Sequence, residues 1–409
     1  MIDKDEVSRL SVDVLSRLQG LVGDPYSYAR AWKGRTGGKV MGFFCHYAPE
    51  EIIHAAGALP ARITGENRVI SESGAHLQSY CCSLARTGLD MALGGDLDFL
   101  DGTVFVHTCD TMQRLSDIWR LNAGYDVHLD VVLPGRLEGD SAWEYLCREL
   151  ASFRERLGEL VGPVDDGALR TSIALYNRNR ALLVDFYRLR RRDPGVLPSD
   201  KALMVVAASA LMDKEEHNAL LEELLGNIEA RLSGAAPGGL PDRPQEEGVE
   251  SRGQAEARPQ AGEKVRLFGI GSVMDQWEFL AMVEDVGGTV IDDDFCTGHR
   301  YAGVMAPEYV DPIESIARRI WDGVPCPCKH VTTRDRAELL LERITGSGAE
   351  GVLFFQFKFC EPHAFDYPYV KKALDERGIP SLHLEIEQGS VSIPRLRTRV
   401  EALLETIRG

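Results

Sequence analysis

The sequence predicts an α/β protein with two doubly wound, Rossmann-like domains and a helical subdomain between them. Short apolar runs alternate with amphipathic segments over residues 38–134, and they do so again from residue 265 onward. Strands and helices that alternate at this spacing form parallel sheets. Between these two regions the pattern is helical only. A chain of 409 residues is long enough for two or three domains.

The first domain is expected to cover residues 1–140 and to begin with a helix. That helix is indicated by a stripe of apolar residues at the spacing of one helix face: Val7, Leu10, Val14 and Leu18. Pro49 and Gly57 mark the start and stop of the next helix, because proline suits a first helical turn and glycine suits the position after the last. We expect helices at 49–56, 82–93 and 110–121, and strands at 61–64, 103–107 and 127–133.

The rest of the chain divides into three parts. Residues 141–232 form the expected helical subdomain, and residues 265–409 form the second α/β domain. Residues 233–264 have no aromatic residue and few aliphatic ones, so they bury too little surface to offset the entropy of ordering, and we expect a flexible linker. In the second domain we expect strands at 265–270, 289–291, 351–357 and 381–386, and helices at 274–286, 312–321, 334–344, 367–377 and 393–407.

The composition argues against nucleic acid or a membrane as the main partner. The chain has 46 Lys and Arg against 63 Asp and Glu, a net charge of −17, which repels phosphate backbones and anionic lipids. No apolar run approaches the ~18 residues of a membrane span, and the first residues lack the layout of a signal peptide. We therefore expect a cytoplasmic protein. In that compartment its nine cysteines are metal ligands or reactive thiols more often than disulfides.

Several cysteines follow predicted strands, where open α/β sheets build their binding sites. Cys109 follows the strand at 103–107, Cys360 follows the strand at 351–357, and Cys296 follows the strand at 289–291. Cys82 begins a predicted helix, where the helix dipole and free amides favour a thiolate.

Three interpretations of these cysteines compete. A buried cysteine often behaves as a small apolar side chain, which fits Cys147 in its helical stretch. Structural zinc sites favour paired cysteines two to four residues apart, and only Cys326-Pro327-Cys328 comes close. Dispersed thiolates from several loops suit an iron–sulfur cluster better, with one iron left open for substrate.

Other polar motifs carry weaker signals. Glu50 and Glu51, with His46 nearby, are candidate proton-transfer groups, although acids in a first helical turn often serve only the helix dipole. Residues 292–294, three aspartates, suit Mg²⁺ but are more typical of a solvated strand end. Residues 190–192, three arginines, are interpreted as a solvated helix end. The G-x-x-x-x-G-K-[ST] pattern of a P-loop does not occur, which argues against ATP hydrolysis by this chain.

Five segments together resemble the 2-hydroxyacyl-CoA dehydratase and benzoyl-CoA reductase superfamily. They are GFFCHYAPEEIIHAAG at 42–57, SYCC at 79–82 with Arg86, TCDTM at 108–112, KFCEP at 358–362 and PSLHLEIE at 380–387. The resemblance implies a catalytic subunit with a [4Fe-4S] cluster between two α/β domains. By motif its ligands fall on Cys82, Cys109 and Cys360, with Cys82 preferred over Cys81 by its distance from Arg86.

The resemblance also implies partners and a reaction. A separate ATP-dependent iron–sulfur activator supplies one low-potential electron, and a CoA thioester receives it to form a ketyl radical that loses its hydroxyl, or to begin reduction of an aromatic ring. A second copy of the chain or a related second subunit completes such a system. Burial between two domains shields this chemistry from water.

The sequence departs from the three-cysteine pattern of most members. Cys45, Cys296 and one of Cys326 or Cys328 are also expected in loops. Six candidate thiolates resemble the branch whose members hold a double-cubane [8Fe-9S] cluster and reduce small molecules. A non-catalytic electron-transfer protein is the third alternative.

Overall fold

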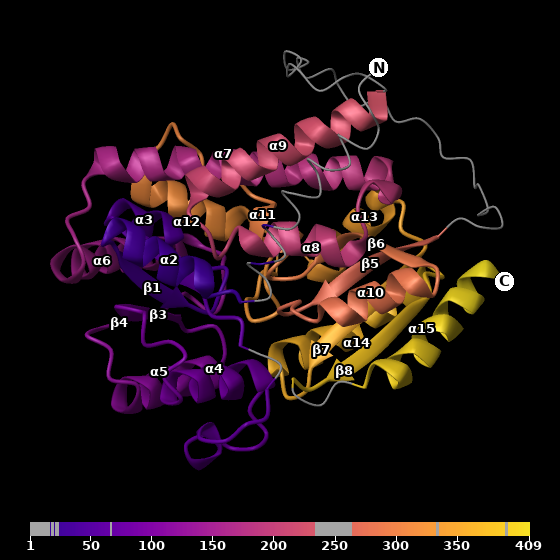
Figure 1. The fold of residues 1–409 in the computed structure, drawn as a ribbon, viewed down its shortest axis with the longest axis horizontal. Helices are drawn as coiled ribbons and strands as arrows, with labels where there is room; N and C mark the ends of the chain where they lie inside the picture. Colours follow the sequence, from indigo (N-terminus) through magenta and orange to yellow (C-terminus); the bar gives the residue numbers. More distant parts are fainter. Residues whose placement is uncertain are drawn as a thin grey trace.

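Two parallel sheets of four strands form the framework of the molecule (Figure 1). The first has the order β2-β1-β3-β4, with β1 at Lys39–Phe43, β2 at Ala58–Arg62, β3 at Gly102–Val106 and β4 at Val127–Val131. The second has the order β6-β5-β7-β8, with β5 at Val265–Gly271, β6 at Gly288–Asp294, β7 at Gly351–Phe357 and β8 at Ser381–Ile386. Every pairing is parallel, which confirms the predicted fold class.

This computed structural model describes residues 24–65, 68–233, 264–332, 335–388 and 392–409, with Arg17 and Gly20. The helix expected at Val7–Leu18 lies outside the described residues, and so does the expected linker apart from Ser233 and Lys264. The domain boundaries stay predictions. None of the described helices is long and apolar enough to cross a membrane.

Helices cover both sheets and fill the region between them. The part of the chain that contains the first sheet also contains the helices α2 (Ser27–Thr36), α3 (Glu50–Ala55), α4 (Ser83–Leu93) and α5 (Asp110–Asn122). The helical region contains α6 (Asp140–Leu160), α7 (Asp166–Arg192), α8 (Ser199–Ala208) and α9 (Lys214–Ser233). The second half contains α10 (Trp277–Asp285), α11 (His299–Ala302), α12 (Pro312–Asp322), α13 (Arg336–Ser347), α14 (Glu361–Glu376) and α15 (Ile393–Arg408).

The long helix α7 connects the two sheets. It begins at an N-cap, Asp165, whose side chain accepts a hydrogen bond from the amide of Ala168. It packs on α3 and α9 and also reaches β6 and α11, so it lies across both halves of the molecule (Figure 1). The apolar core is continuous as well, since one cluster contains Phe105 of β3 and Phe355 of β7. The halves are therefore held together at the place where the strand ends meet.

Strand β1 is an element that the sequence pattern did not reveal. Its five residues include Gly42, and glycine weakens a strand and hides its apolar pattern. A Cβ at Gly42 would lie 2.7 Å from Cδ1 of Leu100, so close packing explains the glycine. Because β1 is central in its sheet, Cys45, two residues after it, enters the same region as the other strand-end cysteines.

A buried histidine makes the stability of this fold sensitive to pH. His217 of α9 is fully buried, and burial with the nearby Lys214 lowers its pKa to about 3. Below the unfolded pKa of ~6.5, the unfolded chain takes up a proton that the native state refuses, so stability is lost as pH falls from there toward 3. We expect the free energy of unfolding to fall by up to ~1.4 kcal/mol per pH unit from this group alone.

The measurement is urea unfolding at several pH values between 6.5 and 5. His217→Gln should show a shallower pH dependence than the unchanged protein. The matched control is the exposed His76, whose replacement by glutamine should leave the slope as it is. Equal slopes for the unchanged protein and His217→Gln would contradict the prediction.

Candidate functional site

Cysteines gather where the carboxyl ends of both sheets meet. Cys109 follows β3 and is the N-cap of α5, and Cys360 follows β7 and is the N-cap of α14. Cys82 is the N-cap of α4. All nine cysteines are free thiols. Three of them thus stand at helix N-termini, where backbone amides favour negative charge on sulfur.

Cys82, Cys109 and Cys360 form what we call the first cysteine group. Burial raises the pKa of Cys82 to about 12, and the neighbouring Cys109 contributes to the shift. Burial likewise raises the pKa of Cys360, with contributions from both Cys82 and Cys109. Each of the three therefore lies within electrostatic range of the others. Phe359, the residue before Cys360, has φ 62° and is the only described non-glycine residue with a positive φ. The backbone is therefore strained at the turn that leads to Cys360.

Cys45, Cys296, Cys326 and Cys328 form the second cysteine group. Burial raises the pKa of Cys45 to about 12, and Cys326 and Cys296 add to the shift. Cys326 also raises the pKa of Cys109 and of Cys360, so the two groups adjoin. Sequence reasoning expected these cysteines in loops, and the structure brings them together from β1, β6 and the connection between α12 and α13.

Two pairs of neighbouring cysteines are distinguished by their surroundings. A hydrogen bond with Cys328 lowers the pKa of Cys326, and the positive charges of Arg300 and Arg336 lower it further. The same hydrogen bond raises the pKa of Cys328. Cys81 has its sulfur 3.9 Å from the side-chain oxygen of Gln78, and it is Cys82 that interacts with Cys109. Cys147 of α6 packs against the apolar core, and its electrostatic partners include no cysteine.

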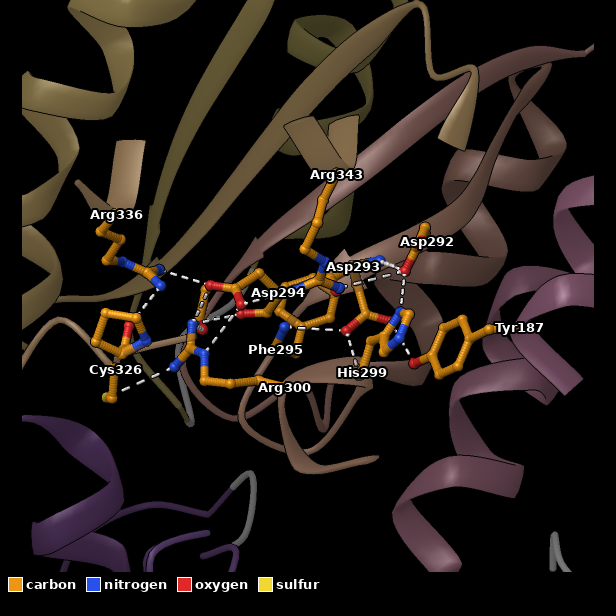
Figure 2. Close-up of polar contacts among 12 residues, drawn as sticks. Tyr187, Asp292, Asp293, Asp294, Phe295, His299, Arg300, Cys326, Arg336 and Arg343 are labelled. Atoms are coloured by element: carbon orange, nitrogen blue, oxygen red, sulfur yellow. Dashed lines mark hydrogen bonds and ion pairs between the residues drawn. The ribbon is translucent and has the colours of Figure 1, made fainter. Parts of the chain in front are cut away.

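Two buried arginines contact sulfurs of the second group. Arg62, the last residue of β2, donates to Sγ of Cys296 at 3.0 Å and to its carbonyl oxygen at 2.6 Å. Arg300 of α11 has its Nη1 atom 3.6 Å from Sγ of Cys326 (Figure 2). The carboxylate of Asp294 holds Arg300 through Oδ2 at 2.6 Å and also pairs with Arg336 and Arg343.

The acidic candidates lie in a buried polar network beside this region. Glu51 pairs with Arg180 and Arg319, which outweigh the effect of burial and lower its pKa to about 2. Burial raises the pKa of Glu50, whose carboxylate accepts a hydrogen bond from Tyr301 at 3.1 Å. Lys214 lies 3.8 Å from the same carboxylate.

His46 connects this network to the cysteines. Its Nδ1 atom lies 3.9 Å from Sγ of Cys45, and burial lowers its pKa well below the usual value, so the ring is neutral. His46 and Arg300 line a small cavity of about 20 Å³, large enough for one water molecule. Arg300 also lines a larger, partly open cavity of about 330 Å³ together with His299 and Arg343.

Comparison with known proteins decides the family. Residues 45–407 match the family model described as 2-hydroxyglutaryl-CoA dehydratase, D-component. The chain belongs to this family. Among its curated relatives are a subunit of the benzoyl-CoA reductase of Thauera aromatica, 28% identical over 97% of this chain and 99% of the relative, and the (R)-phenyllactyl-CoA dehydratase beta subunit of Clostridium sporogenes, 26% identical over 95% and 96%. The (R)-2-hydroxyglutaryl-CoA dehydratase subunit beta of Acidaminococcus fermentans is 26% identical over 96% and 99%. This member of the dehydratase D-component family is accordingly an enzyme of the dehydratase and reductase class.

The cysteines of the two groups come from several separate segments of this family member. Within the part of the chain that the structure describes, no three His, Cys, Asp or Glu side chains are grouped to hold one metal ion. An all-sulfur donor set from several segments is the set that iron–sulfur clusters use.

Two sequence interpretations were wrong for this dehydratase-family chain. The three aspartates at 292–294 are buried and not a solvated strand end: Asp292 and Asp294 pair with basic side chains, and Asp293 accepts a hydrogen bond from the Tyr187 hydroxyl. Arg190 is buried and donates to the carbonyl of Val290, and Arg191 pairs with Asp292, so residues 190–192 are not simply a solvated helix end. Sequence reasoning also gave no role to Arg62, whose sulfur partner lies 234 residues away. Only tertiary structure reveals such a contact.

Proposed function

We propose that this chain is the iron–sulfur catalytic component of a 2-hydroxyacyl-CoA dehydratase or benzoyl-CoA reductase type of system. One observation carries the proposal: thiols from both halves of the molecule converge on one mostly half-buried region in two adjoining groups. Because burial raises the pKa of most of these thiols, they stay protonated until a metal ion binds the sulfur and displaces the proton. The names of the relatives support CoA thioesters as the substrate class.

Under this proposal each cysteine group supplies three thiolates. Cys82, Cys109 and Cys360 would hold a [4Fe-4S] cluster with one iron open. Cys45, Cys296 and Cys326 would hold a second one, and because Cys326 acts electrostatically on Cys109 and Cys360, the two would be close enough to form a double-cubane [8Fe-9S] cluster. Such a cluster supplies single electrons at low potential. We choose Cys326 over Cys328 because Arg300 donates to its sulfur.

The protein's own residues would manage protons and exclude water. Glu50, whose pKa burial raises, would take up and release a proton inside the molecule, and the ring of His46 lines the small cavity and contacts Cys45. Glu51, fixed between Arg180 and Arg319, holds the first turn of α3 in place. These three residues are the proposed proton-transfer machinery, with Glu51 as the anchor.

The proposal includes protein partners. The relatives are named as subunits, which supports a second copy of this chain or a related subunit in the complete enzyme. A separate ATP-dependent iron–sulfur activator would deliver the electron, because the sequence lacks the P-loop pattern needed to hydrolyse ATP itself.

An anaerobic turnover assay tests the reaction class. The protein is mixed with the activator, ATP and either (R)-phenyllactyl-CoA or benzoyl-CoA as probes. Consumption of a thioester that requires both ATP and activator is the expected result. A protein that takes up an electron yet leaves every thioester unchanged would contradict this reaction class.

The iron content tests the second cysteine group. We expect about eight irons per chain after anaerobic isolation, and about four in Cys296→Ala or Cys326→Ala. Cys328→Ala should keep nearly all of its iron, since we assign the ligand to Cys326. About four irons in the unchanged protein, with no further loss in Cys296→Ala, would contradict a double cluster and leave the single-cluster enzyme.

The second cysteine group also favours a second candidate function, the reduction of small molecules. A double cluster is not needed for the single-electron chemistry of a dehydratase, and the 330 Å³ cavity beside Arg300 is small for a CoA thioester. About eight irons together with no thioester turnover would point to this reductase.

A further inference from the structure

The two cysteine groups differ in the charges that face their sulfurs. In the second group two buried guanidiniums donate hydrogen bonds to sulfur, Arg62 to Cys296 and Arg300 to Cys326. Among the described residues, no arginine or lysine makes such a bond to a sulfur of the first group. There the sulfur of Cys360 has the ring of His363 as its partner, with the Nδ1 atom 3.3 Å away. The acidic residue Glu361 directly follows Cys360, in the first turn of α14.

Both arginines are fixed in place, so their charges are permanent features of the site. Arg62 is 1% exposed, and its guanidinium donates to both the carbonyl oxygen and the sulfur of Cys296. These two hydrogen bonds fix the orientation of the guanidinium. Arg300 is held by Asp294 and by the carbonyl of Gly271 at 3.1 Å (Figure 2). Arg336, on the same carboxylate, donates to the carbonyl of Pro325 at 2.8 Å and so fixes the segment that carries Cys326.

Reduction adds negative charge to a cluster and its ligands. Hydrogen bonds from cations to ligand sulfurs stabilise the reduced form more than the oxidised form, and they raise the reduction potential. A nearby carboxylate has the opposite effect. The burial of Arg62 and Arg300 strengthens their influence, because a low-dielectric interior screens charge poorly.

We propose that Arg62 and Arg300 are positioning residues that give the second cysteine group the higher reduction potential, so that an electron entering the chain comes to rest on that side. The inference rests on the proposed function, since it requires a cluster on each group. The step would move one electron: the activator would be oxidised, and a cluster held by Cys45, Cys296 and Cys326 would be reduced, after the electron had passed a cluster held by Cys82, Cys109 and Cys360.

The test is a redox titration monitored by electron paramagnetic resonance on the full-length protein, with iron analysis of each sample. The unchanged protein should show two one-electron steps. Arg62→Met and Arg300→Met should each move the higher step downward and bring the two steps closer. At the original upper midpoint, the ratio of reduced to oxidised second cluster should fall at least tenfold, which is ~59 mV for one electron.

The matched control is Arg343→Met. Arg343 contacts the same carboxylate of Asp294 but no sulfur, so its removal should leave both steps unchanged. Arg62→Lys keeps a cation beside Cys296 and should give a smaller downward shift with full iron content. An equal shift in Arg343→Met, or iron loss in both Arg62 variants, would assign the arginines a structural role and overturn the inference.

The failure of the inference is distinguishable from the failure of the proposed function. About eight irons and two steps in the unchanged protein, with unchanged potentials in Arg62→Met, would overturn the inference alone. About four irons in the unchanged protein would overturn the second cluster and the inference with it. Because Arg62 pairs with no carboxylate in the described residues, its variant remains informative even if Arg300→Met does not fold.

Discussion

Replacing Cys82, Cys109 or Cys360 by alanine is expected to remove the iron of the first cysteine group and to abolish turnover. These three thiols face one another at the ends of β3, β7 and the N-terminus of α4, and a methyl group cannot replace a thiolate–iron bond. The loss of turnover should exceed the roughly 10–100-fold cost of disturbing a residue that merely supports a metal ligand. Iron analysis and the anaerobic assay measure both effects.

Two cysteines serve as controls for this experiment. Cys147→Ala should keep its iron, since this side chain packs against the apolar core and has no cysteine partner. Its stability should fall by only ~1 kcal/mol, as for a typical buried truncation. Cys81→Ala tests the choice within the neighbouring pair, and it should also retain iron. Full iron content in Cys82→Ala, or iron loss in Cys81→Ala, would contradict the assignment of the ligand to Cys82.

Much of this site follows from the order of elements along the chain. A parallel sheet brings the ends of its strands to one edge, so the apolar runs before Cys109 and Cys360 were enough to place each of them at the carboxyl edge of its own sheet. That the edges of the two sheets share one site was implied only by the family resemblance. The structure confirms the two parallel sheets on which that reasoning depends. Cys45 could not be placed at a strand end in this way, because Gly42 concealed strand β1 in the sequence. Its part in the site was therefore predicted from the family resemblance.

The charged partners of the site could not be derived in the same way. Asp294, Arg336 and Arg343 come from different elements, and no periodic pattern specifies which carboxylate meets which guanidinium. A run of three aspartates in a sequence is usually solvated, and its burial here depends on arginines of α7, α11 and α13 together with Tyr187 and His299. Local sequence therefore predicted the thiols, and tertiary packing decided their electrostatic surroundings.

Asp294→Ala is expected to destabilise the fold by about 3–5 kcal/mol, the usual cost of removing one partner from a buried ion pair. The carboxylate is fully buried and shared by Arg300, Arg336 and Arg343, and its loss leaves these cations without their common partner (Figure 2). Burial opposes ionisation of Asp294, but the arginines outweigh it and hold its pKa below the usual range. The stabilisation is therefore present above the unfolded pKa of ~3.9 and is lost as pH falls below it.

Urea unfolding of the metal-free protein at neutral pH measures this effect without a contribution from iron. The control is Asp375→Ala, which breaks an exposed pair with Lys371 and should cost no more than ~0.5 kcal/mol. If an orphaned cation causes the loss, the double variant Asp294→Ala/Arg300→Met should recover part of it, because Asp294 is the only carboxylate that pairs with Arg300 in the described residues and the uncompensated charge is then removed. A cost below ~1 kcal/mol for Asp294→Ala, or no recovery in the double variant, would show that the arginines find other partners and that this carboxylate does not hold the site together.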